Sequence, residues 1–311
     1  MIGVEETLLT ALLNDPADLV GWFALADWHE ENDRLREAEF LRIQISLSGQ
    51  LDAPDRSEKE SRQCQLLAEG LVPPTPSYEL WLRRGLSMRF QLLPPGEFWM
   101  GSDDNPSARG QEGPRHKVSL SRPFLLAATP VTQSQWYAVM RTRPAMFRGS
   151  NRPVERVNWD DAVEFCQTLS RRTGLKFRLP TEAEWEFACR AGISAAYYHG
   201  QKDQVEAIAW FGHRTTQAVG KLRPNGWGLY DMLGNVWEWT ADAFRNYPRR
   251  GLPRRNPHNR RRSSYRVARG GSYSNPENCC RSAARICFAA GGRNDFIGFR
   301  PVLEWPLAAQ R

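Results

Sequence analysis

The feature that most constrains the fold is the stretch NGWGLYDMLGNVWEW at residues 225–239, which holds three glycines and three tryptophans. Glycine permits tight turns that residues with a β-carbon enter only at a cost in free energy. Trp227, Trp237 and Trp239 are large apolar side chains that can pack between such turns. Glu238 stands between two of them, where a buried carboxylate needs a partner. We therefore predict a loop-rich core held together by aromatic side chains.

The first 48 residues have a different character, because their apolar residues recur at helical spacing. Leu8, Leu9, Leu12 and Leu13 share one face of a first helix, which ends at residues 14–16 (Asn-Asp-Pro). A second helix carries residues 22–28 and a third spans 37–47. Residues 14–44 resemble a short helical module that accompanies repeat and interaction domains. The resemblance implies that residues 1–48 form an all-helical module that docks a partner.

The middle of the chain predicts a connection followed by a mixed α+β domain. Residues 49–85 are polar and then rich in proline, which favours a linker with one possible helix. From residue 86 onward, strand-like alternation comes first and helices with clear capping residues follow. Thr132, Asn158 and Thr181 are the expected N-caps of three helices, and Gly174 ends the second of them.

Charge and cysteine usage limit the class of protein. The net charge is +7, and the excess of arginine is concentrated between residues 249 and 269. No nucleic-acid-binding motif accompanies this run, so we interpret it as a solvated loop and do not expect a nucleic-acid partner. No apolar stretch is long enough to span a bilayer, and the N-terminus lacks the basic lead of a secretory signal. The six cysteines show no metal-ligand spacing. We therefore expect a cytoplasmic protein without a membrane partner.

Eight segments occur in a characteristic order: GEFWMGS, TPVTQSQW, PVERVNWDDAVEFC, FRLPTEAEWEFACRAG, PNGWGLYDMLGNVWEWTAD, RGGSY, CRSAAR and IGFR. This order resembles the sulfatase-modifying-factor family, the relatives of the formylglycine-generating enzyme. The resemblance implies an elaborated C-type lectin fold over residues 86–305, of class α+β, preceded by the small helical module. Members of this family often bind structural calcium in the loop that holds Glu238. That implies Leu233, Val236 and Glu238 as calcium ligands, and the alternative is an arginine partner for Glu238.

The same resemblance raises the question of catalysis. Formylglycine-generating members use copper and two cysteines five positions apart, shortly after the RGGSY segment. Here the segment after Tyr273 is shorter, the second cysteine would fall near Glu277, and Cys279 and Cys280 are adjacent. We therefore expect no copper, since two soft thiolate ligands at the required spacing are missing. A related branch uses a three-histidine iron site, but the five histidines are scattered. A formylglycine-type oxidase or a related non-haem metal enzyme remains the alternative to a protein without catalytic activity.

The C-terminal segment resembles a third group, the variable proteins that diversity-generating retroelements mutate. Residues 272–300 contain no Lys, Gln, Trp or Met, and their single Glu is Glu277. These residue types cannot arise from the mutated adenine-rich codons of such systems. The resemblance implies a variable region over 272–300 on a fixed frame of residues 269–272 and 298–300, with Ala283 and Ala284 packed beneath it.

We therefore predict a face that binds an as yet unknown protein or other macromolecule. Its residues are Tyr273, Ser274, Asn275, Asn278, Cys279, Ile286, Cys287, Phe288, Gly292, Asn294, Asp295 and Phe296. The alternative is that Ile286 and Phe288 belong to the core while Cys287 points outward.

Overall fold

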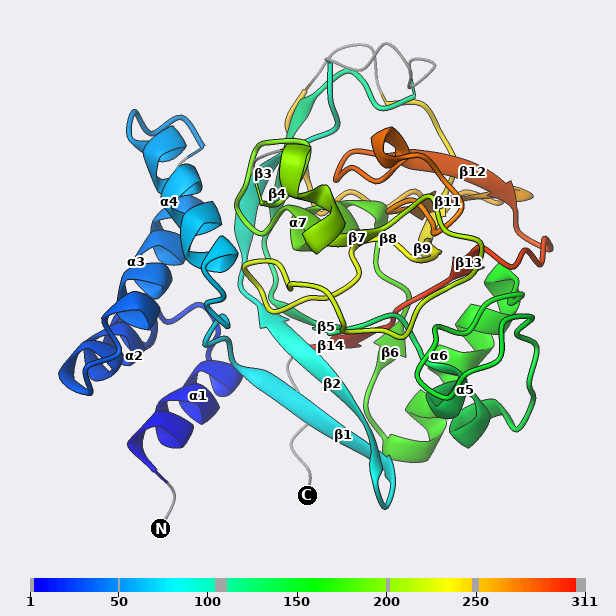
Figure 1. The fold of residues 1–311 in the computed structure, drawn as a ribbon, viewed down its shortest axis with the longest axis horizontal. Coiled ribbons are helices and arrows are strands. Elements are labelled where there is room, and N and C mark those ends of the chain that lie inside the picture. The colour runs from blue at the N-terminus through cyan, green and yellow to red at the C-terminus, as the bar shows by residue number, and fades with distance from the viewer. Residues whose placement is uncertain (1–2, 50, 104–110, 200–201, 248–251, 306–311) are drawn as a thin grey trace.

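A computed structural model describes residues 3–49, 51–103, 111–199, 202–247 and 252–305 of the chain. The helices are α1 (Val4–Asn14), α2 (Leu19–Glu31), α3 (Leu35–Gly49), α4 (Arg56–Ala68), α5 (Gln133–Met140), α6 (Trp159–Thr173) and α7 (Glu182–Arg190), with 3-10 turns η1 (Lys202–Ala207) and η2 (Glu277–Cys279). Figure 1 shows α1 to α4 together on one side of a larger body of strands and loops, which α5, α6 and α7 accompany. The mixed α+β class is as predicted.

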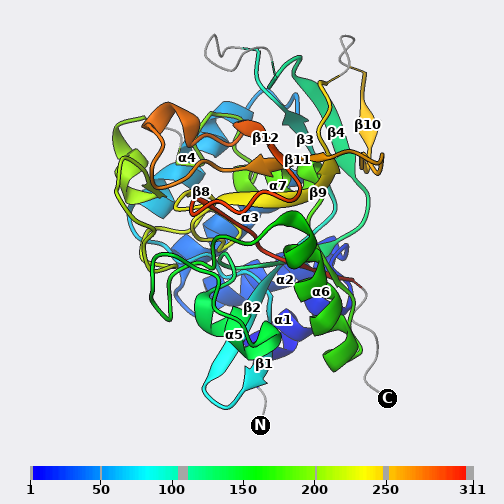
Figure 2. The same ribbon diagram turned by 90° about the vertical axis from the view of Figure 1, so that its right-hand side faces the viewer.

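The strands form four small sheets within the described residues. They are β1 (Ser77–Arg83), β2 (Leu86–Leu93), β3 (Gly96–Met100), β4 (His116–Leu120), β5 (Phe124–Ala127), β6 (Phe177–Arg178), β7 (Ala209–Trp210), β8 (Leu233–Gly234), β9 (Trp237–Ala243), β10 (Arg254–Arg255), β11 (Tyr265–Arg269), β12 (Arg285–Ala289), β13 (Ile297–Gly298) and β14 (Val302–Glu304). The sheet orders are β1-β2-β5-β14-β6, β12-β11-β9-β13, β10-β4-β3 and β7-β8. In Figure 2, β12, β11 and β9 lie beside one another above α6.

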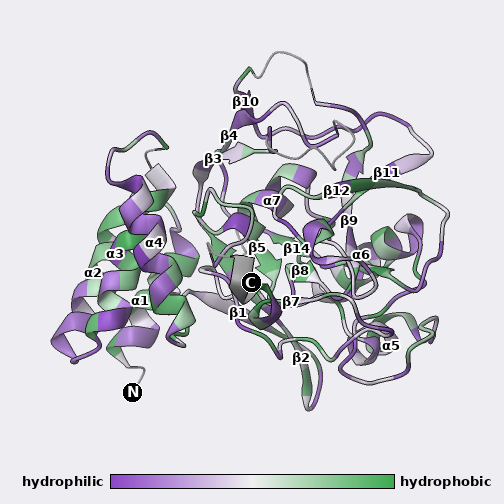
Figure 3. Cartoon of the chain, turned by 45° about the horizontal axis from the view of Figure 1, so that its top comes forward, coloured by the Kyte–Doolittle hydropathy of each residue, from purple (hydrophilic) through white to green (hydrophobic). Residues whose placement is uncertain are grey.

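The N-terminal helices pack on the domain and are not a separately tethered module. Leu12, Trp22 and Leu25 belong to the same buried cluster as Met88 and Phe90 of β2. Hydrogen bonds also cross the boundary: the Gln44 side chain donates to the Gly226 carbonyl at 2.7 Å, and the Gln63 side chain donates to the Ala191 carbonyl at 2.8 Å. Figure 3 shows α4 as mostly hydrophilic, so it packs through a few apolar residues such as Leu66 and Leu67.

The predicted linker over residues 49–85 needs a correction. Its helix is present as α4, but β1 also lies inside this range and pairs antiparallel with β2, with Tyr78 opposite Phe90. The sheet therefore begins at Ser77 and not at residue 86. The apolar/polar alternation in residues 77–83 is broken at Trp81, an aromatic residue that lies on the exposed face of β1 and is 66% exposed.

The capping residues were predicted correctly, since their chemistry is local. Thr132, Asn158 and Thr181 each accept a hydrogen bond from the backbone N–H three residues on, and each forms a reciprocal capping box. Gly174 ends α6 with a φ of 74°, in the left-handed region that glycine enters freely. Within the described residues, no helix combines the length and apolar character needed to cross a membrane.

Candidate functional site

The predicted frame of the C-terminal segment is buried. Arg269, Ser272 and Phe299 are at most 1% exposed, and Ala283 and Ala284 beneath them are each 2% exposed. Gly271 has a φ of 81°, and a β-carbon there would lie 2.7 Å from the Cys280 sulfur. Only glycine fits this close approach, which explains the double glycine of the RGGSY segment.

Between the two ends of the frame, the chain forms the edge strand β12. It pairs antiparallel with β11, with Ile286 opposite Ala268 and Phe288 opposite Arg266. Ile286 and Phe288 are half-buried against the core, and the Phe288 ring lies 5.6 Å from Phe296 and 6.1 Å from Trp239. The half-buried Cys287 alternates to the other face of the strand. Ile286 and Phe288 therefore pack on the core, as the alternative stated for them has it, and part of each side chain still reaches the surface.

Two members of the predicted face need a correction. Tyr273 is only 5% exposed, and its ring packs edge-on against Phe147 at 5.4 Å. The Asn275 side chain accepts hydrogen bonds from the Trp237 indole at 2.8 Å and from the Ser272 backbone at 3.0 Å. Both side chains support the frame, so they are poor positions for free variation.

The remaining members differ in how far they reach the surface. Ser274 and Asn278 are exposed, whereas Cys279, Gly292, Asn294 and Asp295 are half-buried. The structure thus brings Phe288 and Phe296 together, and Ile286 packs against the same core cluster. Separately it places Tyr273 near Asp295, whose charge adds to burial in raising the pKa of Tyr273.

Sequence reasoning missed Glu155, which is 0% exposed close to Asp295. One carboxylate oxygen of Glu155 accepts a hydrogen bond from the Phe147 N–H at 2.8 Å, and the other has no hydrogen-bond partner among the described residues. Burial, with a further contribution from Asp295, raises the pKa of Glu155 to about 7. Glu155 lies in the quoted segment PVERVNWDD, but no spacing there indicates its burial.

The partner of Glu238 is Arg300. The Arg300 guanidinium donates to both Glu238 oxygens at 2.8 Å, and the Trp185 indole donates to one of them at 2.8 Å. Arg300 and Glu238 are 0% and 1% exposed. Both carboxylate oxygens of Glu238 already accept hydrogen bonds from Arg300 or the Trp185 indole. Glu238 is therefore poorly placed to bind calcium together with the Leu233 and Val236 carbonyls.

The cysteines near the frame are poorly suited to hold copper as a pair. Cys280 is 0% exposed, and burial raises the pKa of its thiol to about 12. Burial also raises the pKa of the Cys279 thiol. A raised pKa disfavours the thiolate, which is the form that binds metal. Among the described residues, no three His, Cys, Asp or Glu side chains form a group that could hold a metal ion.

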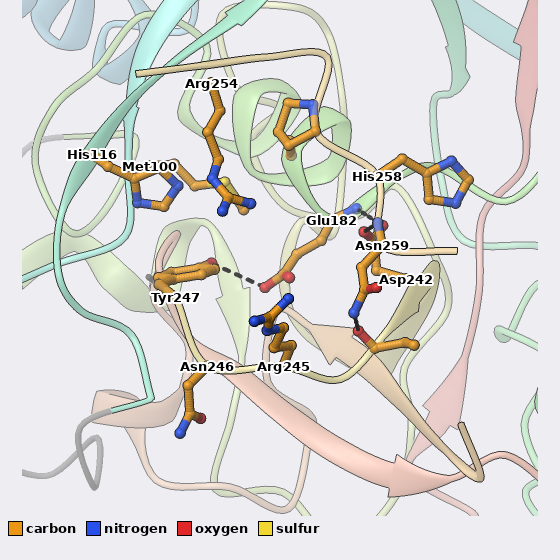
Figure 4. Close-up of a pocket in the computed structure, with 13 residues that line it drawn as sticks. Met100, His116, Glu182, Asp242, Arg245, Asn246, Tyr247, Arg254, His258 and Asn259 are labelled. Carbon is orange, nitrogen blue, oxygen red and sulfur yellow. Dashed lines mark hydrogen bonds between the residues drawn. The ribbon is translucent and has the colours of Figure 1, made fainter. Parts of the chain in front are cut away.

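A cavity of about 610 Å³ lies on the side of the domain where α7 begins, next to β9 and β10 (Figure 4). Glu182 projects into it, held by Arg285 at 2.6 and 3.0 Å and by the Tyr247 hydroxyl at 3.0 Å. The Asp242 carboxylate accepts hydrogen bonds from the backbone N–H groups of Glu182 at 2.7 Å and Asn259 at 2.6 Å. Burial, followed by the charge of Glu182, raises the pKa of Asp242 to about 7.

Comparison with known proteins places this geometry in a family context. The model of the family described as "Sulfatase-modifying factor enzyme 1-like domain" matches residues 86–305. The formylglycine-generating enzyme of Streptomyces coelicolor is 34% identical over 169 residues, which cover 48% of this chain and 52% of that protein. The chain thus spans about half the length of that relative.

Two solved structures resemble the fold closely. Treponema denticola variable protein 1 has a TM-score of 0.68 at 27% identity, covering 73% of this chain and 99% of its own. PvdO from Pseudomonas aeruginosa has a TM-score of 0.66 at 28% identity, covering 73% of this chain and 98% of its own. Both likenesses support the lectin-type fold that the motifs predict.

Proposed function

Because the chain belongs to the family of sulfatase-modifying factor enzyme 1-like domains over residues 86–305, we propose that it uses this scaffold to present a diversified binding surface, as the target of a diversity-generating retroelement. The observation that carries the proposal is the division of residues 272–300 into two kinds. Residues at both ends are buried, as are residues 280 and 282–285 between them. Residues 274–279, 281 and 286–296 reach the surface on an edge strand and its flanking loops. The likeness to a variable protein supports this use of the fold.

The physical reason is that β12 is held by its backbone. Its antiparallel register with β11 runs from Arg269 opposite Arg285 to Tyr265 opposite Ala289, and these ladder hydrogen bonds do not depend on side-chain identity. Ser274 and Asn278 lie outside β12 and are exposed, so they can also change at a cost within about 0.5 kcal/mol. Aromatic and aliphatic groups beside polar ones, as at Phe288 and Asn294, suit a protein partner.

The test is genetic. We expect a reverse-transcriptase gene near this gene, together with a near-copy of the gene's 3′ end that differs mainly at adenines. Sequencing many isolates should reveal substitutions at the outward positions and none in residues 269–272 or 298–300. Isolates whose substitutions scatter evenly over the domain, with no such near-copy in the genome, would refute the proposal.

The 34% sequence identity to a formylglycine-generating enzyme supports a second candidate function, that of a copper-dependent oxidase acting on a cysteine-containing peptide. Copper titration followed by mass spectrometry of such a peptide, in the presence of oxygen, tests it. We expect no turnover, because Cys279 and Cys280 carry raised pKa values. Turnover that is lost in Cys279→Ser and in Cys280→Ser would establish the oxidase instead.

A further inference from the structure

The proposed function does not explain the arginine run between residues 249 and 269, and the structure shows that most of its described arginines lack a carboxylate partner. Residues 243–276 contain ten arginines and no Asp, Glu or Lys. Eight of these arginines are described by the structure, and among the described residues only Arg269 makes an ion pair with a carboxylate. Arg254 and Arg245 are exposed, and both line the cavity in Figure 4.

The floor of the cavity is not negatively charged despite Glu182. The Glu182 carboxylate pairs with Arg285 and Arg269, and Glu186 behind it pairs with Arg269 and Arg190. Three buried arginines thus face two buried carboxylates, which leaves one positive charge. Asp242, whose pKa is raised to about 7, is about half ionised near neutral pH and offsets only part of this positive charge. With Arg245 and Arg254 at the mouth, the cavity is positive overall.

The geometry of strand β10 explains why Arg254 lines the cavity and its neighbour Arg255 does not. Arg254 and Arg255 form β10, which pairs parallel with β4, Arg254 opposite Val118 and Arg255 opposite Ser119. Successive side chains of a strand point to opposite faces. Arg254 accordingly lines the cavity, together with His116, His258 and Asn259, and Arg255 does not. In Figure 4, Arg254 and Arg245 approach the space beside Glu182 from opposite sides.

We propose that this cavity binds a phosphate-bearing small molecule, with Arg245 and Arg254 as the residues that contact its charged groups. A guanidinium is a planar fork that donates two hydrogen bonds to phosphate or carboxylate oxygens. Two arginines on opposite sides suit an anion with more than one charged group, and a volume of about 610 Å³ lies within the usual range of small-molecule sites. None of the twelve residues of the predicted variable face lines this cavity, so the proposal stands apart from that function.

Isothermal titration of the full chain with pyrophosphate at low salt tests the proposal. We expect saturable binding that Arg254→Ala weakens about tenfold or more, the usual effect of losing a charge-assisted hydrogen bond to phosphate. Arg245→Ala should weaken it similarly. Arg255→Ala is the matched control, since it removes an equal charge from the next position of the same strand, and it should change the affinity by less than about twofold.

Two results would overturn the proposal. One is equal weakening by Arg254→Ala and Arg255→Ala, which would assign binding to the general charge of the surface. The other is the absence of pyrophosphate binding. If a single-stranded oligonucleotide binds while pyrophosphate does not, the arginines form an open nucleic-acid-binding surface and not a small-molecule site in the cavity. Both arginines are exposed, so melting curves of the variants should match the parent and exclude misfolding as the cause.

Discussion

Removal of the charge on Glu238 is the sharpest test of how the domain is held together. Arg300 is 0% exposed, so Glu238→Gln leaves its guanidinium buried with its carboxylate partner replaced by a neutral amide. Breaking one side of a buried ion pair costs about 3–5 kcal/mol. For a domain of this size, each kcal/mol lowers the melting temperature by about 2–4 °C, so we expect a fall of about 6–20 °C.

The assay is thermal unfolding followed by circular dichroism, with Glu304→Gln as the control. Glu304 also pairs with an arginine, Arg178 at 2.8 Å, but it is 42% exposed, and such a pair contributes at most about 1 kcal/mol. A fall in Glu238→Gln no larger than that in Glu304→Gln would refute the reasoning. The double variant Glu238→Gln with Arg300→Met should lose less stability than the sum of the single variants, since neither charge is then left alone.

The same experiment decides between the two partners considered for Glu238. With Arg300 in place, added calcium should leave the melting temperature of the parent chain unchanged. A calcium-dependent rise that disappears in Glu238→Gln would show that the carboxylate binds the cation instead, because a ligand that binds only the native state stabilises it.

Three further predictions concern single side chains. Because the pKa of Asp242 is raised, the native state keeps a proton that the unfolded chain releases above about pH 4. The contribution of Asp242 to the free energy of unfolding should therefore fall by on the order of 3 kcal/mol as the pH rises from about 4 to about 7. Urea unfolding of Asp242→Asn should lack this contribution to the pH dependence of stability. Tyr273→Ala should cost about 3–5 kcal/mol, because the ring is buried against Phe147, whereas Ser274→Ala should change stability by less than about 0.5 kcal/mol in the same urea titrations; equal effects would contradict the assigned burial. A thiol reagent should modify half-buried Cys279 well before Cys280, which is 0% exposed and has a pKa of about 12; rapid modification of Cys280 in the native chain would contradict its burial.

Local chemistry made much of the fold predictable from sequence. Helix caps such as Thr132 and Thr181 depend on residues three positions apart, and the double glycine at 270–271 follows from the backbone it permits. The family and its lectin-type fold were recognisable for the same reason, because the motifs are short and keep their order. The proposal of a variable segment over residues 272–300 also rests on sequence, through the residue types that this segment lacks.

The residues that needed the tertiary structure are those whose partners lie far along the chain. Glu238 could pair with calcium or with arginine until the fold brought Arg300 to it across 62 positions. Tyr273 was expected outside, but Phe147 covers its ring. The cavity beside Glu182 gave no sequence signal, since its residues come from five separate segments between Met100 and Asn259. Sequence alone determined the turns, caps and family frame, because each depends on neighbouring residues. The tertiary structure decided which charges are buried together, because that depends on which distant segments pack against one another.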